Sequence, residues 1–177
     1  MTAQKGFRPA LRLVEGAASQ SAPWAWFCGH CAAPAPGDVP PAPSARVCTS
    51  CGLGLLLETR ADAVPTERDA FVVIDNALLV QAVSRHAQSL LAVSEEEAVN
   101  RPISELLMSA DAEAQGNRLA EAISHAADGA SDATTTFVRP WNTFGVRIRA
   151  RIAPCGPPRA ALLVLQSPQR PTLRAVD

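Results

Sequence analysis

The chain lacks the features that mark membrane and secreted proteins. No stretch of eighteen consecutive apolar residues occurs in its 177 residues, so a membrane-spanning helix is not predicted. The opening segment MTAQKGFRPALRLVEG contains no unbroken apolar run of the kind found in a secretory signal peptide. We therefore expect a cytoplasmic protein that has no membrane partner.

The motifs of common enzyme active sites are also missing. The sequence contains no G-x-S-x-G nucleophile elbow and no glycine-rich phosphate loop of the P-loop or Rossmann kind. Its most acidic run, Glu95–Glu97, consists of adjacent residues whose carboxylates would point in different directions around a helix. Such a run is typical of a solvated helix start. We expect no catalytic residues and no enzymatic activity.

A basic patch is absent as well. The formal net charge is −1; residues 1–60 hold five Lys or Arg against three Asp or Glu, and residues 61–168 hold nine against thirteen. Proteins that bind nucleic acid normally carry clustered Lys and Arg side chains. The charge distribution therefore disfavours nucleic acid as a partner but leaves it open.

The most specific signal present is a pair of Cys-x-x-Cys motifs. Residues 32–47 separate them and are too rich in proline to form a helix, so this segment can loop out and return. Four thiolates from two such knuckles suit a tetrahedral zinc site, and a closed site of this kind is structural, because no coordination position is left for substrate. We predict one structural Zn²⁺ per chain, with these metal ligands: Cys28, Cys31, Cys48 and Cys51.

Other roles for these cysteines stay open at this point. Two structural disulfides would require an oxidising compartment, and a thioredoxin-like redox pair would require a βαβ unit around one motif. His30 lies inside the first knuckle and is expected to face solvent, because four cysteines already complete a site. The flanking segments WAWFCGHC and RVCTSCGLGLLLE resemble a zinc ribbon, and their apolar residues are expected to cover the metal.

From Asp69 onward the pattern predicts a compact α+β unit. Residues 70–74 and 78–83 read as a β-hairpin around an Asp-Asn turn. Short helices are expected at 85–92, 95–100 and 102–110, with a Ser94–Glu97 capping box, and a longer helix should end near Gly129. Period-two alternation then predicts three strands within 132–140, 144–154 and 159–168.

This order of two strands, short helices, a longer helix and three strands resembles a PAS domain. The segment FVVIDNALLVQAVSRHAQSLLAVSEEEAVNRPISELL looks like the opening hairpin and small helices of that family. Three positions depart from its pattern: Ser84 replaces an Asn, Ala92 lies near a usual Gly, and Asn100-Arg101 replaces Gly-Arg. The resemblance implies an α+β fold with a PAS-like five-stranded antiparallel sheet and flanking short helices, preceded by the small four-cysteine zinc ribbon.

We accordingly expect four parts along the chain. They are a zinc-ribbon module at 1–58 with metal knuckles at 28–51, a linker at 59–68, a PAS-like sensory or interaction domain at 69–168, and a tail at 169–177.

The resemblance also implies a function. PAS domains are sensory or interaction modules, so it implies a non-enzymatic signalling adaptor or sensor that acts through protein contact, self-association as a homodimer, or a small ligand of unknown identity. His125 is a low-ranked candidate for an axial haem ligand, and Cys155 is expected to be a loop thiol in the turn PCGPP. The alternative is a transcription-associated regulator whose ribbon contacts nucleic acid or the transcription machinery.

Overall fold

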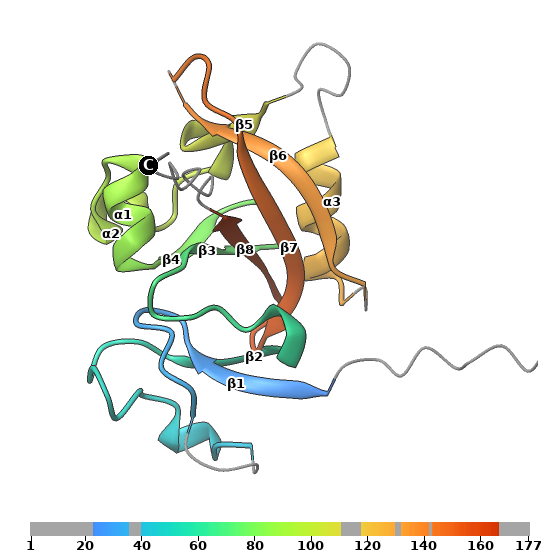
Figure 1. Ribbon diagram of the computed structural model, residues 1–177. Coiled ribbons are helices and arrows are strands. Elements are labelled where there is room, and N and C mark those ends of the chain that lie inside the picture. The colour runs from blue at the N-terminus through green and yellow to red at the C-terminus, as the bar shows by residue number, and fades with distance from the viewer. Residues whose placement is uncertain (1–22, 36–39, 111–117, 130–131, 142, 167–177) are drawn as a thin grey trace, which may run out of the picture.

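The computed structural model describes residues 23–35, 40–110, 118–129, 132–141 and 143–166. Within these ranges eight strands form one antiparallel sheet (Figure 1). The strands are β1 (Trp24–Cys28), β2 (Leu56–Arg60), β3 (Ala70–Asp75), β4 (Val80–Val83), β5 (Leu107–Ser109), β6 (Thr134–Pro140), β7 (Ile148–Gly156) and β8 (Ala160–Gln166).

Three α-helices and three 3-10 turns complete the described fold. They are η1 (Pro43–Ala45), η2 (Ala61–Ala63), α1 (Arg85–Leu91), α2 (Glu95–Ala98), η3 (Ile103–Glu105) and α3 (Arg118–Ala127). No helix in the described ranges combines the length and apolar character needed to cross a membrane.

The strand order confirms the expected fold class. Strands run in the order β1-β2-β7-β8-β3-β4, and β6 pairs with both β7 and β5. The series β4-β3-β8-β7-β6 is the expected five-stranded antiparallel sheet, and β1, β2 and β5 extend it. Both β6 and β2 use the same edge of β7: β6 pairs with Ile148–Ile152, and β2 pairs with Cys155 and Gly156.

The central strands are buried on both faces. In β3, Val72 and Ile74 pack with the helices, whereas Phe71 and Val73 pack on the opposite face with the N-terminal hairpin. Successive side chains of a strand point to opposite faces, so burial of both sets requires a layer on each side. Figure 1 shows α1 to α3 around the upper sheet and the β1–β2 hairpin beneath it.

The N-terminal hairpin belongs to the same sheet. Strands β1 and β2 pair along their whole length, and Thr59 of β2 lies opposite Cys155 of β7. The fully buried Thr59 hydroxyl donates a 2.8 Å hydrogen bond to the Pro154 carbonyl. The predicted boundary between residues 58 and 59 therefore falls inside β2, and the predicted linker contains η2. The division into modules stays a prediction, and residues 169–177 lie outside the described ranges.

Local sequence signals explain the helices. The Ser94 side chain accepts from the Glu97 N–H, and the Glu97 carboxylate accepts from the Ser94 N–H, so the predicted capping box is confirmed. Helix α3 buries Leu119, Ile123 and Ala126 against the sheet, as its 3.6-residue spacing predicts.

Two local predictions were wrong. The helix expected at 102–110 is only the turn η3, followed by strand β5, because Leu107 to Ser109 find a pairing partner in β6. Cys155 is a buried residue of β7 and not a turn residue. Leu107 to Ser109 pair with the distant β6, and Cys155 pairs with Thr59 of β2 as well as with Ala160 of the adjacent β8.

Candidate metal centre

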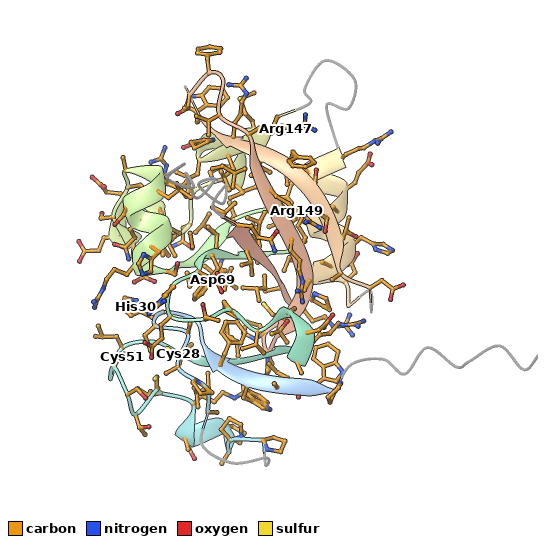
Figure 2. The ribbon with its side chains drawn as sticks, viewed as in Figure 1. Cys28, His30, Cys51, Asp69, Arg147 and Arg149 are labelled. Carbon is orange, nitrogen blue, oxygen red and sulfur yellow. The ribbon has the colours of Figure 1, made fainter. Side chains whose placement is uncertain are left out.

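The four cysteines of the two motifs meet at one point beside the sheet. Cys28 ends β1, Cys31 follows in the next turn, and Cys48 and Cys51 lie in the turn before β2; Figure 2 labels Cys28 and Cys51 there. Their Sγ atoms all lie within 4.8 Å of one another. All five cysteines of the chain are free thiols, so the structure does not contain the two disulfides that the sequence left open.

The spacing of these sulfur atoms fits a tetrahedral ion. The Sγ atoms of Cys28 and Cys51 are 3.7 Å apart, and those of Cys31 and Cys48 are 3.8 Å apart. A tetrahedral Zn–S distance of about 2.3 Å corresponds to an S···S edge of about 3.8 Å. The cluster is thus able to hold a metal ion.

The two knuckles repeat one backbone turn. The Ala32 N–H bonds to the Cys28 carbonyl in the first, and the Gly52 N–H bonds to the Cys48 carbonyl in the second. Ala32 and Gly52 both adopt a left-handed backbone, with φ of 62° and 70°. This turn aims both thiols of a Cys-x-x-Cys pair to the same side, which is why the spacing in the sequence is informative.

Backbone N–H groups also donate to the sulfur atoms. The N–H groups of His30 and Cys31 lie 3.4 Å from Cys28 Sγ, and that of Gly54 lies 3.4 Å from Cys51 Sγ. The Gly54 N–H helps to lower the pKa of the Cys51 thiol to about 6, while burial raises the pKa of Cys28. Metal ligands are thiolates, so the site contains one cysteine that is readily ionised beside one that a cation must stabilise.

Burial around the cluster is uneven. Cys28 and Cys48 are buried with Ala33 and Leu56, whereas Cys31 and Cys51 are partly exposed. Trp26 packs against this cluster, and the Arg46 guanidinium lies 5.8 Å from the centre of its ring. Only some of the leucines that were expected to cover the metal are buried. Leu56 and Leu57 are buried, but Leu53 and Leu55 are 75% and 54% exposed.

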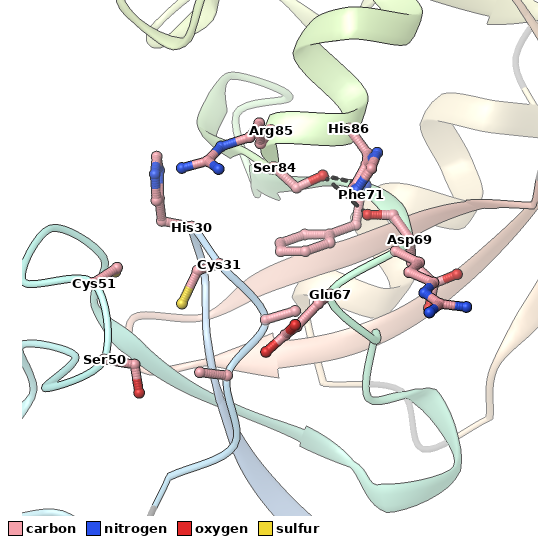
Figure 3. A pocket seen from close by; sticks show the side chains of 13 residues that line it. His30, Cys31, Ser50, Cys51, Glu67, Asp69, Phe71, Ser84, Arg85 and His86 are labelled. Atoms are coloured by element: carbon pink, nitrogen blue, oxygen red, sulfur yellow. Dashed lines mark hydrogen bonds between the residues drawn. The ribbon is translucent and has the colours of Figure 1, made fainter.

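A cavity of about 470 Å³ lies beside the knuckles and is also lined by residues of β3 and the start of α1 (Figure 3). Phe71 of β3 forms its floor, and Cys31 and Cys51 face it from the metal side. Ser84 contributes from the opposite wall, where its hydroxyl accepts from the Phe71 N–H and donates to the Asp69 carbonyl. The more exposed pair of thiols therefore borders this cavity.

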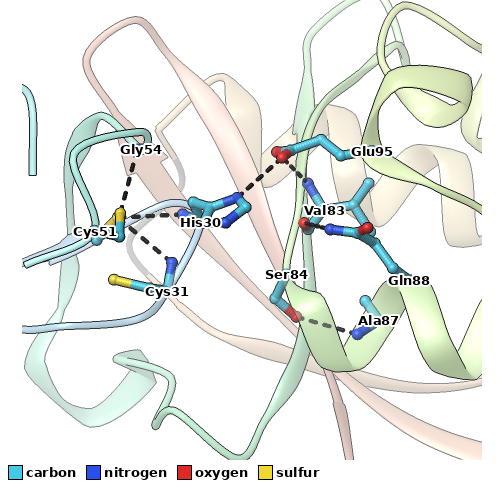
Figure 4. A network of polar contacts seen from close by, with 10 residues as sticks. His30, Cys31, Cys51, Gly54, Val83, Ser84, Ala87, Gln88 and Glu95 are labelled. Atoms are coloured by element: carbon cyan, nitrogen blue, oxygen red, sulfur yellow. Dashed lines mark hydrogen bonds and ion pairs between the residues drawn. The ribbon is translucent and has the colours of Figure 1, made fainter.

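His30 joins the knuckle to the sheet's helical side, and its expected exposure to solvent was wrong. Its Nδ1 lies 2.9 Å from Glu95 Oε2, and its side chain is 16% exposed (Figure 4). The other oxygen of Glu95 accepts a 3.4 Å hydrogen bond from the Val83 N–H. Glu95, predicted as part of a solvated helix start, thus bridges the first knuckle and β4.

The remaining candidate lies away from this centre. His125 is exposed on α3, and it lines neither the cavity above nor the groove described below. Side chains of strands and helices fill the layer beneath it, including Ile123, Val138 and Leu163, which are fully buried. The structure therefore gives no further support to His125 as a haem ligand.

Comparison with known proteins bears on the fold. No family model matches the chain, and no curated protein matches it.

Solved PAS domains do resemble it. The PAS domain of nitrogen regulation protein NR(II) from Vibrio parahaemolyticus is 15% identical with a TM-score of 0.41, covering 55% of this chain and 87% of that one. A PAS domain from Colwellia psychrerythraea is 19% identical with a TM-score of 0.42, covering 55% and 84%. The PAS domain of the Cronobacter turicensis quorum-sensing receptor RpfR, solved with BDSF, is 12% identical with a TM-score of 0.43, covering 59% and 97%. At these values the similarity concerns the fold alone.

Proposed function

We propose that the chain is a non-enzymatic signalling adaptor, in which a structural zinc ribbon is attached to a PAS-like domain that binds a protein partner. The proposal is supported by exposed aromatic side chains in the connection between β6 and β7. Trp141 is 52% exposed there and Phe144 is 85% exposed. Large aromatic side chains on a protruding connection are typical anchors of a protein interface.

Two arginine side chains lie over phenyl rings in this region. The guanidinium of Arg139 lies 5.2 Å from the ring centre of Phe144, and that of Arg147 lies 4.0 Å from the ring centre of Phe137. Arg149 is exposed and lies opposite Phe137 in the strand register. Figure 2 labels Arg149 on β7 and Arg147, which directly precedes that strand. Neither β6 nor β7 contains Asp or Glu, so the surface complements an acidic partner.

The zinc ion would serve this adaptor as a structural element. Four thiolates would hold it, and they leave no open position, so its contribution is folding free energy, on the order of 10 kcal/mol for small zinc modules. The ion would hold the knuckles against the sheet. Native mass spectrometry is expected to find one zinc per chain, and a denatured spectrum is expected to show no disulfide.

The proposal is tested with a hairpin variant in which Trp141 and Phe144 are both changed to Ser. Partners captured by the zinc-loaded wild type are compared with those of the variant, and each candidate is then purified and titrated. A true partner is expected to bind the variant about tenfold more weakly or worse, since two interface anchors are lost. The matched control changes the exposed Val47 and Leu90 to Ser and should leave binding intact. Partners that bind both variants equally would refute the role of the hairpin.

Nucleic acid is the second candidate, because guanidinium groups stacked on phenyl rings also offer planes for stacking bases. It would make the chain a transcription-associated regulator that binds through β6 and β7. Titration with a single-stranded thymidine oligonucleotide at two salt concentrations decides between the two. Saturable binding that falls steeply with salt and disappears in the hairpin variant favours nucleic acid. Sedimentation of the wild type alone tests the expected homodimer.

A further inference from the structure

A second cavity opens on the other side of His30, between the second knuckle and the β3–β4 hairpin. We call it the leucine groove; its volume is about 500 Å³, within the range of small-molecule sites. Residues 53–57 form one wall, Val73 and Ala82 form the other, and Pro158 to Ala160 of the β7–β8 turn close one end. Strand β2, which contains Leu57 of the groove, lies at the opposite end of the sheet from the β6–β7 connection (Figure 1).

The apolar part of the groove is aliphatic. Leu57 and Val73 are almost fully buried and belong to the core between ribbon and sheet, whereas Leu53 and Leu55 are exposed. No phenyl or indole ring lines the groove among the described residues. Exposed leucines above a buried aliphatic floor favour an aliphatic ligand, because its binding removes their surface from water.

The ionisable side chains that line the groove have hydrogen-bond partners, with one exception. His30 and Glu95 pair with each other at 2.9 Å. Asp75 is satisfied locally: one carboxylate oxygen accepts from the N–H groups of Ala77 and Leu79, and the other accepts from Gln81.

Arg159 is the exception. It lies in the β7–β8 turn at the end of the groove, is exposed, and has no hydrogen-bond or ion-pair partner among the described residues. Its planar guanidinium is suited to bidentate contact with a carboxylate. Asp75 and Glu95 already have hydrogen-bond partners, so Arg159 is the charged side chain of this groove that is left to contact a ligand, and it favours an anionic group at that end.

We propose that the leucine groove binds a small aliphatic carboxylic acid. Its carboxylate contacts the Arg159 guanidinium, and its hydrocarbon body lies on Leu55 and Leu57. The ligand touches the second knuckle and the β3–β4 hairpin together, so it contacts both the ribbon and the PAS-like sheet. This site goes beyond the proposed partner contact and does not depend on it.

Calorimetric titration of the zinc-loaded full chain with octanoate tests this site. We expect saturable binding of one octanoate per chain. Arg159→Gln should weaken it about tenfold, the usual effect of losing a charge-assisted hydrogen bond. Octanol, which lacks the charge, should bind wild type weakly and be insensitive to that variant. Arg85→Gln removes an exposed arginine that lines the other cavity, and it should leave octanoate binding unchanged.

A second variant tests the aliphatic contact. Leu55→Ser changes an exposed side chain, so the fold should persist, and octanoate binding should weaken while a circular dichroism melt stays close to that of wild type. The proposal is overturned if folded, zinc-loaded protein shows no saturable binding, if Arg159→Gln binds as wild type does, or if Arg85→Gln is equally weakened. The hairpin variant should bind octanoate normally, so this site and the partner contact can fail independently.

Discussion

Ala92 adopts a backbone conformation that suits glycine. It caps α1 with φ 51° and ψ 45°, in the left-handed region, and its side chain is exposed. An L-residue with a Cβ atom there costs roughly 1 kcal/mol relative to glycine. The position lies near the glycine that the PAS pattern places after the small helix. The departure noted in the sequence is therefore a local strain and not a change of fold.

Ala92→Gly is accordingly expected to raise the free energy of unfolding by about 0.5–1 kcal/mol, measured by urea denaturation of the zinc-loaded protein. The matched control is Ala122→Gly within α3, where the backbone is helical. There the same change should lower the free energy of unfolding by about 0.5–1 kcal/mol. Equal effects of the two substitutions would contradict this account of Ala92.

Cys155 is the one cysteine outside the metal cluster. Burial raises the pKa of its thiol from about 9 to about 12. Between these values the thiol ionises in the unfolded chain but stays protonated in the native one. The stabilisation is therefore complete below about pH 9 and is lost as the pH rises toward 12.

This titration predicts a difference between wild type and Cys155→Ala. From pH 8 to pH 10 the free energy of unfolding of wild type should fall by about 1.4 kcal/mol more than that of the variant. Urea titrations at the two pH values measure this difference, in which the titration of all other groups cancels. An identical fall in both proteins would show that the native thiol ionises near its ordinary pKa.

At the scale of elements, strands with one solvent-exposed face were the easiest to predict. Strand β7 begins with buried Ile148, Ala150 and Ile152 alternating with arginines, and this period is visible in the sequence. The capping box of α2 and the buried stripe of α3 were predictable for the same reason, because each depends on residues within a few positions. Strand β5 was missed because its partner, β6, is about thirty residues away.

The same distinction applies to the candidate site. Each knuckle is a local turn, so the four cysteines could be predicted from spacing alone. The contact between His30 and Glu95 joins residues 65 positions apart, and nothing in the local pattern of either residue indicates it. The leucine groove likewise combines residues from segments that are far apart in the sequence. Only the docking of the ribbon on the sheet brings them together.

Gly54 packs closely against the first knuckle and leaves no room for a side chain. A Cβ atom there would collide with Cys28 Sγ and lie 2.7 Å from His30 Cβ. Gly54→Ala is therefore expected to displace the first knuckle and weaken zinc binding by about 10–100-fold, measured by competition with a chromophoric chelator. Gly29→Ala is the control: its Cβ would meet the flexible end of the Leu57 side chain at 3.1 Å, so affinity should change little. Equal affinities of all three proteins would mean that the knuckle relaxes.

At the scale of the whole molecule, the ribbon is the outer layer of the sheet. Phe27, Ala32 and Leu57 pack on Phe71, Val73 and Leu162, and the rings of Phe27 and Phe71 meet edge to face at 5.9 Å. Residues 70–74 and 160–165 are all apolar, but the sequence does not indicate what covers the second face of β3 and β8. The metal centre adjoins this layer, so its integrity and that of the sheet are linked.

Removal of the metal should therefore uncover the sheet. We expect a chelator to loosen the knuckles, increase the binding of the dye ANS, and speed hydrogen exchange in β1 and β2 more than in α3. Re-addition of zinc should reverse all three effects. A Cys155→Ala protein should respond in the same way, because that residue is not a ligand. Unchanged exchange in β1 and β2 after metal loss would mean that packing alone holds the hairpin.

The pairing of β2 with β7 has a consequence for synthesis on the ribosome. Thr59 lies opposite Cys155, so the β1–β2 hairpin must wait for almost a hundred further residues before its neighbouring strand β7 emerges. During that interval Phe27 and Leu57 can reach Phe71 and Val73 of β3 but lack Leu162 of β8. The knuckles, by contrast, need only residues 28–51 to close around an ion. Early binding of a metal would fold the nascent β1–β2 hairpin before β7 and β8 are synthesised and pack against it.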